Sequence, residues 1–95
     1  MPFFIASYEY IGDADAQQVV RPRHREFLQG LGATLVASGP TDARGAFLIF
    51  DAASADEVAT LLDDDPFWHE GFIGERRVVG WTPVLGRWVE SGLIS

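Results

Sequence analysis

Histidine and carboxylate side chains are the strongest candidates for chemistry in this chain of 95 residues. The sequence contains no Cys and no Lys, and Arg supplies all seven basic side chains. Thiol nucleophiles, disulfides and thiolate metal sites are therefore excluded, as are a lysine Schiff base and a P-loop lysine. Any catalysis must come from His, Asp, Glu, Tyr, Ser or Arg.

His24 lies in a segment whose apolar residues recur at helical spacing, at Phe27, Leu28 and Leu31. Positions three, four and seven apart share one side of a helix, so His24 is expected on the inward face. A histidine there is most simply a buried side chain that is hydrogen-bonded to a neighbour. A role in proton transfer is the second interpretation, and the spacing alone leaves both open.

Asp65 directly precedes Pro66, as a helix N-cap precedes a proline in the first turn. Capping alone would select an aspartate here, but a catalytic role is compatible with it. A carboxylate that caps the helix and also accepts the ring N–H of His24 would fix the imidazole tautomer. The other ring nitrogen could then take or give a proton, which is general acid–base chemistry without a nucleophile or a cofactor. We therefore expect no cofactor.

A metal site is the weaker hypothesis for the same residues. His69 and Glu70 could join His24 and Asp65 as ligands, but the sequence shows no metal-binding spacing such as HxxxH. We interpret His69 as a solvent-exposed helix residue and expect no metal.

Five further residues are candidates for contacting a ligand. Ser38 beside Gly39 lacks the GxSxG setting of a nucleophile, so it is interpreted as a turn residue that offers a hydroxyl or backbone N–H. Arg21 is a candidate for binding an anionic group at a pocket mouth. Phe67 and Trp81 are most simply core or dimer contacts, and they are also candidates for walling a pocket around a flat ligand.

Composition predicts a single soluble domain spanning 1–95, with 85–95 as a C-terminal tail whose apolar residues should dock on something. No apolar run approaches the roughly 20 residues of a membrane span, and the first ten residues do not resemble a signal peptide, so we expect the cytoplasm. A net charge of −7 makes nucleic acid and anionic membranes improbable partners.

The patterning predicts an α+β domain with strand and helix elements in the order βαββαβ, which is the ferredoxin-like arrangement. A short extra helix should precede the last strand. The expected strands are 2–10, 33–37, 45–50 and 77–82, and the expected helices are about 22–31, one starting at the Ser54 and Glu57 capping box, and about 66–70. A separate turn is expected within 13–20.

Several short motifs, taken in order, resemble the YciI-like (YCII-related) family over about residues 3–84. They are Arg-Pro-x-His at 21–24, Gly-Pro at 39–40, Asp-Pro-Phe at 65–67, Gly71, and a last strand ending at Pro83. The resemblance implies a dimeric α+β barrel in which two four-stranded sheets face each other. It also implies an active site built on a His-Asp pair, which maps to His24 and Asp65 and favours the functional interpretation of both.

These observations lead to one function hypothesis and two rivals. The first is an enzyme that moves protons on a small cyclic or unsaturated organic acid, as a lyase or isomerase does, with His24 and Asp65 as the catalytic pair. The second is a non-catalytic protein that binds a small ligand or serves as an accessory subunit. The third is a structural dimer in which the pair only ties two helices together.

A homodimer is expected because both faces of the sheet carry apolar residues, as in FFIA at 3–6 and FLIF at 47–50. The sharpest structural expectation concerns the pair itself. His24, in the first turn of its helix, should meet Asp65 at the edge of a cavity that holds a small ligand.

Overall fold

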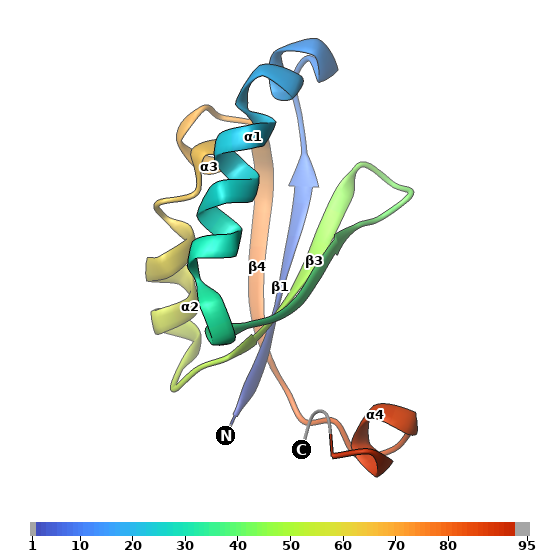
Figure 1. The fold of residues 1–95 in the computed structure, drawn as a ribbon. Coiled ribbons are helices and arrows are strands. Elements are labelled where there is room, and N and C mark those ends of the chain that lie inside the picture. The colour runs from blue at the N-terminus through green and yellow to red at the C-terminus, as the bar shows by residue number, and fades with distance from the viewer. Residues whose placement is uncertain (1, 93–95) are drawn as a thin grey trace.

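A four-stranded antiparallel sheet forms the centre of the molecule in the computed structural model, which describes residues 2–92 (Figure 1). The strand order is β2-β3-β1-β4, which is the order that a βαββαβ chain of the ferredoxin-like kind produces. This confirms the predicted fold class. The strands are β1 (Phe3–Tyr10), β2 (Leu35–Pro40), β3 (Gly45–Asp51) and β4 (Ile73–Trp81).

Three helices lie together on one side of this sheet, and a fourth lies apart beyond the end where the N-terminus is found (Figure 1). The three are α1 (Ala14–Gly30), α2 (Ala55–Leu62) and α3 (Pro66–His69), and the fourth is α4 (Arg87–Glu90). A short 3₁₀ turn, η1 (Gly32–Thr34), joins α1 to β2.

α1 is longer than predicted, because it begins at Ala14 and continues through Pro22 rather than starting there. Asp13 caps it, accepting a hydrogen bond from the backbone N–H of Ala16 at 3.2 Å. A proline inside a helix removes one backbone hydrogen bond. Burial offsets that loss, since Gln17 and Val20 extend the buried face of the helix by two turns before His24.

β2 also differs from its prediction, because Ser38 and Gly39 are paired strand residues and not part of a turn. Pairing with β3 continues to Pro40, which lies opposite Ala46. A proline is tolerated there because β2 is an edge strand. β4 begins at Ile73, before the predicted residue 77.

Two helix starts are built as the sequence indicates. Ser54 Oγ accepts from Glu57 N at 3.1 Å, although the Glu57 carboxylate accepts from Ala53 N rather than from Ser54 itself. Asp65 caps α3, and Pro66 occupies the first helical position. Gly71, at a φ of +78°, allows the chain to turn away after α3.

The core lies between the sheet and the helices. Its largest fully buried apolar side chains come from β3, α2 and α3, and they are Leu48, Phe50, Val58, Leu62 and Phe67. On the opposite face of the sheet, which no helix within residues 2–92 covers, Phe47 is 56 % exposed and Val79 is 48 % exposed. The strand residues therefore have apolar side chains on both faces.

The tail that follows β4 keeps much of its apolar surface exposed. Val84 and Leu85 are largely exposed, and Leu85 and Trp88 border a hollow together with Trp81. The predicted docking of the tail also involved Leu93 and Ile94, which lie outside the described residues. Among residues 2–92, no helix has the length and hydropathy needed to cross a membrane.

Candidate active site

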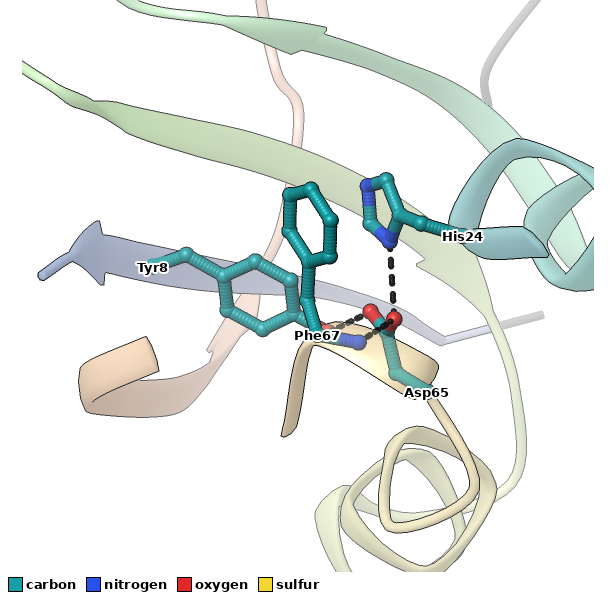
Figure 2. Close-up of polar contacts among 4 residues, drawn as sticks. All are labelled: Tyr8, His24, Asp65 and Phe67. Carbon is teal, nitrogen blue, oxygen red and sulfur yellow. Dashed lines mark hydrogen bonds and ion pairs between the residues drawn. The ribbon is translucent and has the colours of Figure 1, made fainter. Parts of the chain in front are cut away.

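The structure brings His24 and Asp65 together although 41 positions separate them in the chain. Nδ1 of His24 lies 2.7 Å from Oδ1 of Asp65, a short hydrogen bond between two buried side chains (Figure 2). Because an ionised carboxylate can only accept, the geometry assigns the proton to Nδ1 of the neutral ring. His24 therefore presents Nε2 as its free nitrogen.

Asp65 is completely buried, and its carboxylate accepts hydrogen bonds from three different elements. Oδ1 accepts from His24 in α1 and, at 2.9 Å, from the backbone N–H of Phe67 in α3. Oδ2 accepts from the hydroxyl of Tyr8 in β1 at 3.0 Å (Figure 2). Both oxygens of the buried carboxylate are thereby satisfied, as a buried charge requires.

His24 is held from the side as well as by its hydrogen bond. Its ring stacks on that of Phe67, with centroids 4.1 Å apart and planes 6° from parallel. Nε2 points away from Asp65 (Figure 2). The expectation that His24 lies in the first turn of its helix is wrong, since α1 starts ten residues earlier and places His24 in its middle. It does lie on the buried face, as the spacing predicted.

A cavity of about 240 Å³ adjoins His24 between α1 and the β2–β3 hairpin. Helix α1 supplies one wall through side chains spaced three and four residues apart, at Arg21, His24, Arg25 and Leu28. The strands supply the rest, with Tyr8, Tyr10, Ser38, Gly39, Pro40, Ala46 and Leu48. The cavity combines apolar walls with a few polar groups, as small-molecule sites do.

The residues predicted to contact a ligand divide into three groups in the structure. Arg21, Ser38 and Gly39 line the cavity. Phe67 does not line it, because it is fully buried behind His24 and acts as the surface on which the ring stacks. Trp81 lies elsewhere, at the end of β4 opposite Phe3, where it borders the hollow formed with the tail.

Tyr8 and Tyr10 are site residues that the sequence analysis missed. Both lie on the helix-facing side of β1 and line the cavity. Burial, and then the charge of Asp65, raise the pKa of both hydroxyls above the usual range for tyrosine. The two-residue alternation in β1 could have placed them on one face together, but nothing in it indicates that this face meets Asp65.

Two charged side chains line the cavity beside His24, and both are cationic. They are Arg21 and Arg25, and the lining includes no Asp or Glu. Arg21 lies over the edge of the site with its guanidinium carbon 5.7 Å from the Phe67 ring centroid, and its buried Nε has no hydrogen-bond partner in the described part of the chain. In a chain of net charge −7, this is a local concentration of positive charge.

The weaker hypothesis of a metal site joined His69 and Glu70 to His24 and Asp65 as ligands. His69 is exposed on α3. Within residues 2–92, no group of three or more His, Asp or Glu side chains could hold a metal ion.

Sequence and structure comparisons place the chain among proteins of known fold. The family model of the YCII-related domain matches residues 1–82. No protein with curated functional information matches the chain.

One similar solved structure is the 5-chloro-2-hydroxyhydroquinone dehydrochlorinase TftG from Burkholderia phenoliruptrix, in complex with 2,5-dihydroxybenzoquinone. It is 29 % identical, with a TM-score of 0.73, and the alignment covers 86 % of this chain and 94 % of that one.

Two more distant structures share the fold alone. A NIPSNAP family protein from Agrobacterium tumefaciens is 16 % identical with a TM-score of 0.58, covering 87 % of this chain and 92 % of that one. An antibiotic biosynthesis monooxygenase is 15 % identical with a TM-score of 0.56, covering 90 % of this chain and 100 % of that one.

Proposed function

Because the chain belongs to the YCII-related domain family, we propose that it is a small-molecule enzyme of the lyase or isomerase type. Its substrate is a small cyclic or unsaturated organic acid, and His24 with Asp65 performs general acid–base proton transfer on it. The observation that carries this proposal is a histidine held at 2.7 Å by a buried carboxylate, with its ring at the wall of a cavity.

The proposed chemistry uses the two nitrogens of His24 differently. Nδ1–H donates to Asp65, so the lone pair on Nε2 can accept a proton from a C–H or O–H group of the substrate. The imidazolium that forms is stabilised by the adjacent carboxylate, as in other histidine–aspartate pairs. The same proton is then returned to another atom of the substrate in an isomerisation, or leaves with the departing group in an elimination.

The charges of the cavity support an anionic substrate. Arg21 and Arg25 flank His24 on α1, and no acidic side chain opposes them in the lining. Guanidinium groups bind carboxylate, enolate and phenolate oxygens well. A cavity of about 240 Å³ suits one small ring. TftG, a dehydrochlorinase whose structure holds 2,5-dihydroxybenzoquinone, provides a precedent for a small ring compound as the ligand of a similar fold.

The test is a screen of purified protein against small lactones, enols and halogenated hydroquinones, followed by substitution of His24. His24→Gln should lower kcat on any substrate found by about 10²–10⁴-fold, the usual contribution of a general acid–base residue. His69→Gln is the matched control, because it replaces the second histidine of the chain, which is exposed. A His24→Gln variant as active as the parent would eliminate the mechanism.

A non-catalytic ligand-binding role is the second candidate, and the low exposure of His24, at 7 %, favours it. A ring this enclosed has restricted access for a reacting atom. In that case a ligand should co-purify unchanged and in stoichiometric amount, with no turnover of any compound in the screen.

A homodimer is part of the proposal, with the helix-free faces of two sheets packed against each other. The apolar side chains on that face, including Phe47 and Val79, support it because a monomer would leave them in water. Light scattering should give a dimer, and a stable 10.5 kDa species at micromolar concentration would refute it. A cytoplasmic location remains a prediction from the sequence.

A further inference from the structure

Tyr8 occupies a position at the site that the His-Asp mechanism does not by itself explain. Its hydroxyl donates to Oδ2 of Asp65 at 3.0 Å, while Oδ1 accepts from His24 and from the backbone of Phe67 (Figure 2). Asp65 is 0 % exposed and Tyr8 only 3 %. Among the described residues, the hydroxyl of Tyr8 is the hydrogen-bond partner that the structure gives to Oδ2.

We propose that Tyr8 is a positioning residue that locks the Asp65 carboxylate in the rotation that directs Oδ1 at His24, and so keeps His24 in its Nδ1–H tautomer. This inference rests on the proposed function of the pair. The terminal torsion of an aspartate is broad and roughly two-fold, so hydrogen bonds at Oδ1 alone restrain it weakly. With Tyr8 bound to Oδ2, rotation breaks bonds at both oxygens.

The hydroxyl of Tyr8 can serve as a permanent donor because it keeps its proton. Burial, and then the negative charge of Asp65, raise the pKa of Tyr8 above its ordinary value, which outweighs the opposing effect of Arg76. The backbone fixes the position of Tyr8 as well. It lies in the middle of the sheet, opposite Ala46 on β3 and Arg76 on β4.

The test is Tyr8→Phe, which removes the hydroxyl and keeps the buried ring. Tyr10→Phe is the matched control, since Tyr10 lines the same cavity from the same strand, and its hydroxyl forms no hydrogen bond with any residue that the structure describes. Circular dichroism and melting temperature verify that both variants are folded.

The decisive measurement needs no substrate. Long-range ¹H–¹⁵N correlation spectra report which nitrogen of each histidine carries the proton, and the chain has only two histidines. In the parent protein, the neutral form of His24 should carry its proton on Nδ1 alone. In the Tyr8→Phe variant, neutral His24 should become a mixture of the two tautomers. His69 should not change in either variant. An unchanged His24 tautomer in Tyr8→Phe would overturn the proposal.

Kinetics on any substrate found supply an independent test. Tyr8→Phe should lower kcat by about tenfold with KM within about twofold of the parent, because a misoriented base weakens the transition state more than substrate binding. His69→Gln, at an exposed residue outside the cavity lining, should leave both kcat and KM unchanged. A kcat equal to that of the parent in folded Tyr8→Phe would refute the positioning role. Failure of the proposed function is seen separately, as full activity in His24→Gln.

Discussion

Substitution of Asp65 tests the hydrogen-bond network at the site most directly. Asp65→Ala removes the N-cap of α3, which contributes about 1 kcal/mol. It also leaves the His24 Nδ1–H and the Tyr8 hydroxyl buried without an acceptor, at about 1–3 kcal/mol each. The expected loss is therefore about 3–7 kcal/mol, a large part of the about 5–15 kcal/mol that stabilises a typical domain.

Asp65→Asn should cost much less, at about 1 kcal/mol. Its side-chain oxygen can still accept from His24 and from the backbone of Phe67, and its amide can donate to Tyr8 once that hydroxyl turns to become the acceptor. Because this variant keeps every hydrogen bond of the cap, it should fold even where Asp65→Ala does not.

Urea unfolding followed by tryptophan fluorescence measures both differences, with the chain's three Trp residues as probes. Asp64→Ala is the matched control, because Asp64 is the exposed neighbour of Asp65 and should change stability by no more than about 0.5 kcal/mol. If Asp65→Ala lies within about 1 kcal/mol of the parent, the network does not hold the three elements together and the reasoning is refuted. A large loss of stability combined with unchanged ligand binding would favour the purely structural interpretation of the pair.

Four other outcomes are expected. Because the pKa of Tyr8 is raised, the folded state keeps a proton that the unfolded state loses above pH 10.0. The free energy of unfolding should therefore fall as the pH rises past that value, and this fall should be less steep in Tyr8→Phe. Glu9 lies opposite Glu75 on the helix-free face of the sheet, and the hydrogen bond and charge of Glu75 raise the pKa of Glu9. Because two carboxylates that face each other repel at neutral pH, Glu75→Gln should raise the melting temperature there. This gain should vanish as the pH falls through the raised pKa and Glu9 becomes neutral. Phe47→Glu should convert the proposed dimer to a monomer in light scattering without unfolding the chain, and a variant that is still dimeric would argue against the proposed interface. Arg25→Gln should weaken binding of an anionic ring compound by about two- to fivefold in calorimetry and leave a neutral analogue unaffected.

Features that depend on neighbouring residues could be predicted from the sequence. Asp65 caps α3 because its carboxylate reaches the N–H of Phe67 only two positions away, and Pro66 suits the first turn whatever lies around it. Ser54 caps α2 for the same local reason. The order of strands and helices also follows from periodicity, which is why the fold class and the buried side of His24 were predicted correctly.

Features that depend on distant contacts were decided only by the tertiary structure. The local rule that proline starts a helix gave the wrong beginning for α1, because the burial of Gln17 and Val20 extends the helix through Pro22. The alternation of β1 shows that Tyr8 and Tyr10 share a face, but only the packing of α3 against that face brings Tyr8 to Asp65, 57 positions later. Trp81 has a large flat side chain of the kind that can wall a pocket. The register of β4 with β1 nevertheless places it opposite Phe3, away from the cavity beside His24. Side-chain type and spacing set what each residue can do, whereas its partners are set by strand register and helix packing, which a periodic pattern does not encode.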